Sequence, residues 1–447
     1  MRTLYKIALL VMIAIMVVSC GPKPTTQPTQ PGATSVPATE PAATPVTIHV
    51  LTMDQAGLSP AEIDQIARDF EALNPEIKVV MEYVGYDYVH DKIVTGMAAT
   101  PPAYDAAMID LIWTDEFVKA GYLLDVTDQI TPEMTAGIFP AAWNAITRDN
   151  KVYGLPWLMD TKYFMYNTDI LQQAGFTAPP KTWEELVVQA TAIKAQGLVE
   201  YPIIWSWPQQ EGAVCDFTIL LYGNGGTFLD ANGGPAFNNE KGVQALTWMK
   251  QTLDDGLSNP SSVASNEMAV EASFLAGQAA FAVNWLFQYS DSLDAAKSQI
   301  VGKAGFAPMP VFAAGAAAGI QSASVDGSSP FGVMATTPYA DQTWRFLAYL
   351  SSNDVQMQYS AKMLPVWQAD FEGDNLALLE AAAPTNPVTV PAFLGQFPYA
   401  NQRPTVSYYN EASMALQLAL QEALTGVKTP QEALDAAAAK WVELAAQ

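Results

Sequence analysis

The chain of 447 residues is poor in cysteine, histidine and basic side chains. Two Cys and two His leave almost nothing from which a zinc site of the usual kind could be built, and two Cys make no disulfide scaffold. Lys and Arg number 21 against 45 Asp and Glu, a formal charge of −24. General nucleic-acid binding needs a basic surface. The composition therefore predicts no metal, no cofactor and no nucleic-acid partner.

Long apolar runs are also scarce, and the one that stands out lies at the N-terminus. Arg2 and Lys6 precede an apolar run over 7–18, which is short for a bilayer span and typical of a secretion signal. The run ends in Val17-Val18-Ser19-Cys20, which resembles a bacterial lipobox, where cleavage falls before a cysteine that receives a lipid. We expect a signal peptide at 1–19 and a lipid on Cys20; the alternative is an ordinary signal peptide with an incidental cysteine.

Residues 20–46 form a segment that cannot pack a core. Seven Pro and six Thr fall within 21–45, which is typical of an extended tether. With Cys20 lipidated, Cys215 is the one cysteine left, either a reactive thiol or, as its apolar neighbours favour, a buried small residue.

The body after the tether is predicted to be α/β. Residues 46–53 and 77–84 are strand-like, and a helix between them starts with the capping box Ser59-Pro60-Ala61-Glu62 and stops at Asn74-Pro75. This β-α-β unit implies a parallel sheet with a right-handed crossover. Half of the residues are hydrophobic, enough for two or three domains of ~150 residues.

Further elements follow the same alternation. Residues 106–112 read as a strand followed by a helix that ends near Gly121, and 342–350 as a helix. Capping boxes open helices at Thr182–Glu185, with Gly197 as the stop, and at Thr429–Glu432. The alternation predicts more than one doubly wound α/β unit.

These segments, in this order, resemble the extracellular solute-binding proteins of family 1, the sugar-binding, maltose/trehalose-binding-protein-like lipoproteins of ATP-binding-cassette importers. The matching pieces are Phe70-x-x-x-Asn74-Pro75-x-Ile77-x-Val79, Asp110-x-Ile112-Trp113, Ala120-Gly121 through Asp125, Tyr153-Gly-Leu-Pro-Trp157, Asp160-Thr161, Tyr166-Asn167, Pro180-x-Thr-Trp183-Glu-Glu-Leu186, Phe274-x-x-Gly277-x-Ala-Ala280-Phe, Asn284-Trp285, Gly327-Ser-Ser329 and Ala423-Leu-Thr-Gly426.

The resemblance implies a two-lobe periplasmic-binding-protein fold of class II, with a doubly wound sheet in each lobe and three hinge crossings, near 157–161, 312–325 and 364–367. Lobe 1 would be 47–158 plus 326–364, and lobe 2 would be 159–325 plus 365–447. It also implies a monomer outside the cytoplasm that captures a di- or oligosaccharide between the lobes and passes it to the permease subunits of an importer, without catalysis.

Candidate ligand contacts follow from strand exits and from the resemblance. Asp110 comes directly after a predicted strand, with Trp113 close by, where open α/β sheets bind ligands; a helix cap is the alternative for Asp110. Sugars offer apolar faces and hydroxyl rims, which suit aromatic rings and planar polar groups. The remaining candidates are Trp157 and Asp160 at a crossing, Trp207 at a strand exit, Trp285 as the family's stacking platform, Asp326 and Gly327 in its glycine-rich loop, Trp367 at the third crossing and Tyr408. Packing is the competing interpretation for each.

Three other functions stay open. A glycosidase could use paired carboxylates, but no nucleophile-elbow, zincin or dinucleotide motif is present. A cation such as a polyamine would suit Trp faces with Asp and Glu. A lipoprotein with a structural or sensory role is a third possibility.

Overall fold

The computed structural model describes residues 45–54, 57–360, 362–382 and 394–447. It divides into two compact units, 1–43 and 44–447, and all of the described residues belong to the second. The predicted signal peptide, Cys20 and the tether up to residue 44 lie outside the described residues. No helix in the described part of the chain has the length and apolar character needed to cross a membrane.

The first sheet is built mainly from the N-terminal part of the unit. Its strands stand in the order β2 (Ile77–Val84), β1 (Val46–Met53), β3 (Ala106–Met108), β12 (Ser329–Val333) and β6 (Gly154–Leu158). Strand β1 runs parallel to β2 and β3, whereas β12 is antiparallel to β3 and β6. The sheet is therefore mixed, because β12, from much later in the chain, lies between β3 and β6 and runs in the opposite direction to both.

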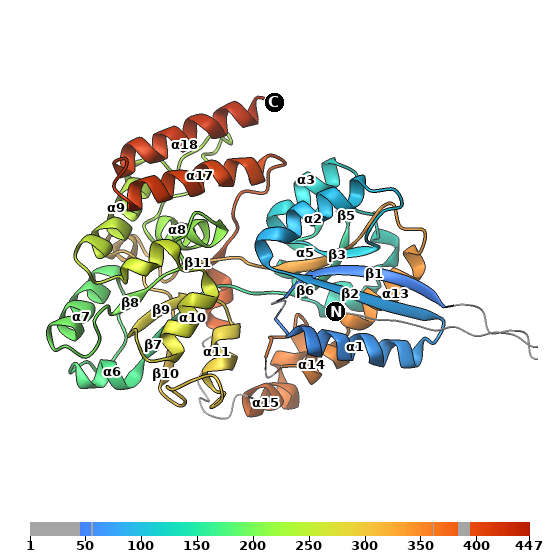
Figure 1. Cartoon of the computed structure of the whole chain (residues 1–447), viewed down its shortest axis with the longest axis horizontal. Helices are drawn as coiled ribbons and strands as arrows, with labels where there is room; N and C mark the ends of the chain where they lie inside the picture. The colour runs from blue at the N-terminus through green and yellow to red at the C-terminus, as the bar shows by residue number, and fades with distance from the viewer. Residues whose placement is uncertain (1–44, 55–56, 361, 383–393) are drawn as a thin grey trace, which may run out of the picture. The chain divides into compact units, whose positions relative to one another are not determined.

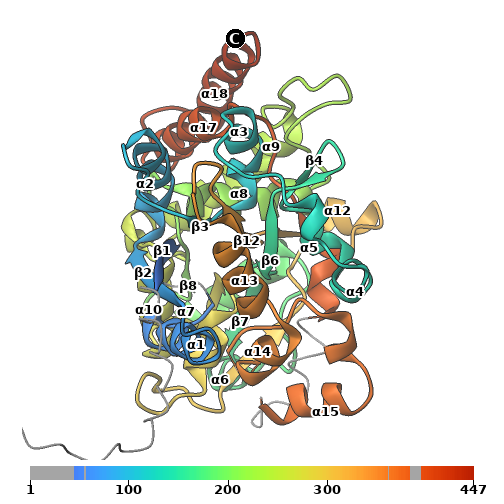
Figure 2. The ribbon, with the colours of Figure 1, turned by 90° about the vertical axis from the view of Figure 1, so that its right-hand side faces the viewer.

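Helices cover both faces of this sheet. Helices α1 (Pro60–Leu73) and α13 (Ala340–Leu350) pack together on one face, against Ile48 and Val50 of β1, and α2 (Tyr86–Ala98) packs on the other against Leu51 (Figures 1 and 2). The strand alternates its side chains between the two cores, as period-two geometry requires.

The predicted β-α-β unit is present. The Glu62 carboxylate accepts hydrogen bonds from the Ser59 backbone N–H at 2.9 Å and from Ser59 Oγ at 2.7 Å, so the capping box opens α1. At the other end, the Asn74 side chain donates to the Phe70 carbonyl at 2.9 Å and closes the last turn.

The predicted strand over 106–112 is shorter than expected. β3 ends at Met108, and a 3₁₀ turn, η1 (Leu111–Trp113), follows, because Asp110 Oδ1 accepts a hydrogen bond from the Ile112 backbone N–H. Helix α3 (Thr114–Lys119) comes next, and Gly121 ends it with a φ of 70°. The rest of this region holds η2 (Thr127–Gln129), α4 (Pro132–Gly137), α5 (Pro140–Asn144), β4 (Thr147–Arg148), β5 (Lys151–Val152), α14 (Asn353–Gln358), η4 (Gln368–Phe371) and α15 (Gly373–Ala382).

The second sheet has the order β10 (Ala304–Ala307), β7 (Tyr163–Asn167), β9 (Phe281–Asn284) and β8 (Ile203–Ile204). Strand β7 is antiparallel to both neighbours, and β8 is parallel to β9. Around it lie α6 (Thr168–Gln173), α7 (Trp183–Ala195), α8 (Glu211–Gly223), α9 (Glu240–Asp254), η3 (Pro260–Ala264), α10 (Glu267–Leu275), α11 (Phe287–Ser292), α12 (Ala313–Ala317), η5 (Phe397–Tyr399), α17 (Tyr409–Leu424) and α18 (Pro430–Ala445). The C-terminal pair α17 and α18 packs on α8 and α9 (Figure 1).

Of the two further capping boxes that the sequence predicts, one is complete and the other is half formed. The box at Thr429 is complete, with Glu432 accepting from the Thr429 N–H at 3.0 Å. At Thr182 it is half formed: Thr182 Oγ1 accepts from the Glu185 N–H at 3.1 Å, but the Glu185 carboxylate accepts from the Lys181 N–H at 2.7 Å instead.

The two sheets are joined by chain segments that lie side by side. The chain leaves β6 for β7 through residues 159–162 and returns to β12 through β11 (Ser324–Val325). The Gly327 N–H donates to the Asp160 carbonyl at 2.9 Å, and Thr161 Oγ1 donates to the Val325 carbonyl at 2.7 Å. Strand β13 (Ala400–Asn401) pairs with β11.

At the third expected crossing, 364–367, the chain contacts both halves. Leu364 packs with Tyr163 of β7, whereas Val366 accepts a hydrogen bond from the Phe139 N–H and Trp367 Nε1 donates to the Ser351 carbonyl. The two-lobe α/β fold with both helices and sheets in each half is thus as expected.

Candidate functional site

A cavity of about 390 Å³ opens between elements of the two sheets. Three groups of residues line it. Elements of the first sheet supply Met53, Asp54, Gly57, Gly85, Tyr86, Asp87, Asp110, Leu158, Ser329, Lys362 and Met363; elements of the second supply Gln210, Glu211, Gly212, Cys215, Asn266, Glu267, Met268, Trp285, Leu286 and Phe287; the joining segments supply Asp160, Gly327 and Arg403. Its volume falls in the lower part of the ~300–1,000 Å³ range of small-molecule sites.

Trp285 contributes the aromatic ring of the cavity. It follows β9 directly, is partly exposed, and its backbone N–H donates to the Asn284 side chain at 2.9 Å. The ring lies so close to Gly327 that a Cβ there would stand 2.3 Å from Trp285 Cζ3. A glycine at 327 is therefore required for the ring position. Both residues were expected at the site, and the structure brings them together.

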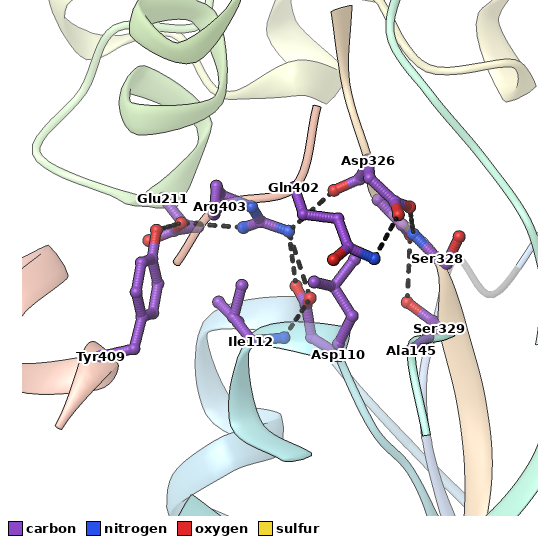
Figure 3. A network of polar contacts seen from close by, with 12 residues as sticks. Asp110, Ile112, Ala145, Glu211, Asp326, Ser328, Ser329, Gln402, Arg403 and Tyr409 are labelled. Atoms are coloured by element: carbon purple, nitrogen blue, oxygen red, sulfur yellow. Dashed lines mark hydrogen bonds and ion pairs between the residues drawn. The ribbon is translucent and has the colours of Figure 1, made fainter. Parts of the chain in front are cut away.

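Arg403 is the centre of a buried polar network, drawn in Figure 3. Its side chain is 1% exposed; Nη1 donates to Glu211 Oε1 at 2.8 Å, and Nη2 donates to Asp110 Oδ1 at 3.2 Å and to the Asp326 carbonyl at 3.3 Å. Glu211 opens α8 beside the second sheet, and Asp110 follows β3 of the first. One guanidinium group thus links both sides of the cavity.

The Asp110 carboxylate has most of its hydrogen-bonding capacity filled by the protein. Oδ2 accepts from the Tyr86 hydroxyl at 2.6 Å, and Oδ1 accepts from the Ile112 N–H and from Arg403. Asp110 thus caps the 3₁₀ turn η1 while it also lines the cavity. It does not cap helix α3, as the alternative interpretation had it, because Trp113 is the N-cap of α3. Trp113 is buried behind it and stacks on Tyr86, with ring centroids 5.6 Å apart.

Glu211 is satisfied to the same degree. Its Oε1 accepts from Arg403 and from the Tyr409 hydroxyl at 2.8 Å, and its Oε2 accepts from Ser413 Oγ and from Gln417 Nε2. Tyr409, rather than the expected Tyr408, therefore reaches the network, and burial raises its pKa well above the usual value. Tyr408 packs against the apolar core beside it.

Asp160 accepts fewer hydrogen bonds from the protein than Asp110 and Glu211 do. Its Oδ1 accepts from the Thr161 N–H at 2.8 Å. Burial raises its pKa to about 7, helped by the charge of Asp326, while hydrogen bonds from the Thr161 and Leu286 backbone N–H groups oppose the rise. Asp326 is buried and accepts from the Ser328 N–H at 2.9 Å and from Gln402 at 3.3 Å, so its side chain points to the joining segments.

Like Trp113, three more of the predicted tryptophans lie in packed surroundings and not among the residues that line the cavity. Trp157 of β6 is fully buried in the core on one face of the first sheet, with its ring centroid 6.1 Å from that of Phe331. Trp207 is fully buried and stacks on Trp205 at 5.0 Å. The Trp367 ring lies against Gly137.

Other groups of the site were not predicted as ligand contacts. Asp87 of α2 accepts from Gln210 at 2.7 Å across the cavity, and burial together with the charge of Glu267 raises its pKa. Glu267 opens α10, and Asn266 caps that helix. Arg403 and Glu267 have no local signal in the sequence, because their partners lie far away along the chain.

Cys215 lies at the wall of the cavity. It is 2% exposed, and burial raises its pKa to about 12, so the thiol is not a thiolate at neutral pH. This agrees with the buried-residue interpretation. Among the described residues no group of three or more His, Cys, Asp or Glu side chains is arranged to hold a metal ion.

Two α/β sheets joined by adjacent segments, with a ligand-sized cavity between their elements, define a two-lobe solute-binding protein. The model of the family "bacterial extracellular solute-binding protein" matches residues 56–357. The chain belongs to this family, whose members bind solutes rather than transform them.

Particular relatives agree with this assignment. A probable ABC transporter-binding protein of Deinococcus radiodurans is 28% identical over 344 residues, 74% of this chain and 77% of the relative. Maltose-bound MalE3 of T. maritima is 26% identical with a TM-score of 0.80, over 89% of this chain and 100% of that one. A solute-binding protein of Thermotoga lettingae bound to α-D-tagatose is 25% identical with a TM-score of 0.79, over 89% and 99%.

Proposed function

We propose that this protein captures a carbohydrate, a di- or oligosaccharide, in the cavity and delivers it to the membrane subunits of an ATP-binding-cassette importer. It would do so without chemical change of the ligand. Family membership supports solute binding, and the two structural relatives that hold maltose and tagatose support a sugar as the solute.

The observation that carries the proposal is the pairing of the Trp285 ring with carboxylates at one cavity. A flat indole face suits the C–H face of a sugar ring, and carboxylate oxygens accept hydrogen bonds from its hydroxyl rim. Asp160, Asp87 and Glu267 line the same cavity and supply such oxygens. We propose Trp285, Gly327 and Asp160 as ligand contacts, joined by Asp87 and Glu267. A role of Asp110, Trp113, Trp157, Trp207, Asp326, Trp367 or Tyr408 in contacting the ligand stays a prediction.

The proposed location is outside the cytoplasm, on a membrane to which Cys20 anchors the chain as a monomer. The lobe boundaries of the sequence analysis, 47–158 plus 326–364 and 159–325 plus 365–447, are part of this proposal. The anchor would hold the sugar-binding unit within reach of the importer, with the tether of residues 20–46 as spacer.

A cationic solute such as a polyamine is the second candidate. Among the described residues, six carboxylates line the cavity, from Asp54, Asp87, Asp110, Asp160, Glu211 and Glu267, against the two cations Lys362 and Arg403. Such an excess attracts positive charge, and an indole face binds cations.

The test is calorimetry and thermal shift of the purified chain against mono-, di- and oligosaccharides and spermidine. A ligand present at 100 times its Kd stabilises the native state by about 2.7 kcal/mol, enough for a clear shift. Trp285→Ala should weaken carbohydrate binding strongly while the fold stays intact. A shift with spermidine alone would replace the sugar by a cation, and silence across the panel would refute both.

A further inference from the structure

Lys162 is a fully buried cation directly behind the cavity. Its side chain is 0% exposed, and its Nζ stands 2.7 Å from Asp216 Oδ1 and 3.4 Å from Glu267 Oε1. The same Nζ lies over the Trp285 ring, 5.3 Å from its centroid. Trp285 and Glu267 line the cavity, whereas Lys162 and Asp216 do not. Lys162 therefore contacts both of these cavity groups while it stays out of reach of a ligand.

The sheet explains why these groups meet. Strands β7 and β9 pair antiparallel with Tyr163 opposite Asn284, so that the next residues outward, Lys162 and Trp285, face each other at the strand ends. Helix α8 passes the same end and supplies Asp216. A Cβ on Gly212 of α8 would stand 2.4 Å from Glu267 Oε1, so the glycine leaves room for that carboxylate.

The charges of this cluster do not cancel. A buried ammonium needs compensation, and Asp216, itself 0% exposed, provides it. Burial lowers the pKa of Lys162, but the charges of Asp216 and Glu267 outweigh burial and raise it, so the lysine stays protonated. Burial raises the pKa of Asp216 to about 6, which leaves it ionised at neutral pH. Two carboxylates share one cation, and Glu267 is the one of the two that lines the cavity.

Stability alone is a weak reason for this arrangement. A buried ion pair can often be replaced by apolar residues without loss of stability, because desolvation offsets the attraction. What an apolar residue could not do is hold an indole ring by a cation–π contact and a carboxylate by an ion pair at the same time.

We infer that Lys162 is a positioning residue of the carbohydrate site, which fixes the Trp285 ring and the Glu267 carboxylate in the orientations in which both face the cavity. Lys162 does not touch the ligand; it sets the affinity by pre-organising two groups that do. This inference rests on the proposed function for its effect on binding, but its effect on Trp285 is independent of any ligand.

The test compares variants that differ in the lysine. Because K162M alone leaves Asp216 unpaired in the interior, the informative pair is D216N and K162M/D216N. K162R keeps a cation at this position, and a guanidinium group can also lie over an indole ring. The matched control is D115N/R148M, which removes a partly buried ion pair of 2.6 Å. The other hydrogen bonds of Arg148 go to the Asn144, Thr147 and Leu111 carbonyls, and none of these residues lines the cavity.

Two measurements are made on the full-length chain. The first is the Kd for the tightest carbohydrate of the panel, which we expect to rise about tenfold from D216N to K162M/D216N. The second is the ¹⁹F spectrum of chain labelled with 5-fluorotryptophan, with the Trp285 resonance assigned by W285F. This resonance should shift or broaden in K162M/D216N, return towards its original position in K162R, and stay in place in D115N/R148M.

The outcomes separate the inference from the function it rests on. An unchanged Trp285 resonance in K162M/D216N overturns the role of Lys162 even if affinity falls. The inference is also overturned if the Trp285 resonance shifts in K162M/D216N but the Kd of this variant equals that of D216N. If the wild-type chain binds no carbohydrate at all, the proposed function fails, and the resonance alone then decides whether Lys162 positions the ring.

Discussion

Removal of the Arg403 guanidinium group should lower the free energy of unfolding about as much as removal of any other single side chain in the unit. The variant R403M keeps the apolar stem and deletes the charge, leaving Asp110 and Glu211 buried without their cation at 7% and 10% exposure. The hydrogen bonds to the two carboxylates are lost, at ~1.5–3 kcal/mol each, together with the one to the Asp326 carbonyl. Breaking a buried pair by removing one partner costs ~3–5 kcal/mol. A loss of ~4 kcal/mol over some 400 residues lowers Tm by about 5 °C.

The assay is urea unfolding, with the free energy of unfolding extrapolated to water and the slope m compared between variants. R403M/E211Q should be less destabilised than R403M, because one unpaired carboxylate has been neutralised while the Tyr409 hydroxyl still has an acceptor. Arg345, an exposed arginine at 47% exposure, supplies the control: R345M should stay within ~0.5 kcal/mol of the wild type. A loss below ~1 kcal/mol in R403M would refute the reasoning that the guanidinium is what makes the two buried carboxylates tolerable.

Three other predictions test single groups of the site. G327A should weaken carbohydrate affinity about tenfold by calorimetry, because its Cβ would displace the Trp285 ring, whereas G395A, with no atom within 4 Å of the new Cβ, should not. Because burial raises the pKa of Asp160 to about 7, the native state binds a proton that the unfolded state releases near pH 4. The free energy of unfolding should therefore fall by up to ~4 kcal/mol as the pH rises from 4 to 7. Urea unfolding of D160N should show a weaker dependence of this free energy on pH. Cys215 should resist alkylation at pH 7.5 in the native chain and react once the chain is unfolded; rapid native labelling would contradict its burial.

The fold was accessible from the sequence because its signals are local. A Ser or Thr followed three residues later by Glu satisfies backbone groups within one turn, and the boxes at Ser59 and Thr429 formed as written. The same reasoning was incomplete where two local options compete. Asp110 could end a strand or cap a turn, and the cap shortened β3. Glu185 had two N–H groups within reach and took that of Lys181.

The site could be predicted from the sequence only in part, because local sequence patterns determine neither the direction of a side chain nor its partners from distant parts of the chain. Asp160, Trp285 and Gly327 were expected from the hinge crossing, stacking platform and glycine-rich loop that the family resemblance implies, and all three line the cavity. Trp207 was expected there from a strand exit, yet its ring stacks on Trp205 inside the core. Arg403 finds Glu211 and Asp110 at separations of 192 and 293 residues, which no spacing rule can anticipate.

The polar groups at the cavity divide by how fully the protein itself satisfies them. Asp110 and Glu211 each accept three or more hydrogen bonds from side chains and backbone, so they have little capacity for further donors. Through Arg403 they connect the two sides of the cavity. Asp160, Asp87 and Glu267 have fewer protein donors, and burial has already raised the pKa of the first two. A ligand that enters must therefore bring hydrogen-bond donors to acceptors that lack them, since a buried carboxylate without donors is costly. A ring of hydroxyl groups around an apolar face does this while its face covers the Trp285 indole, and an apolar ligand of the same size would leave those acceptors unpaired.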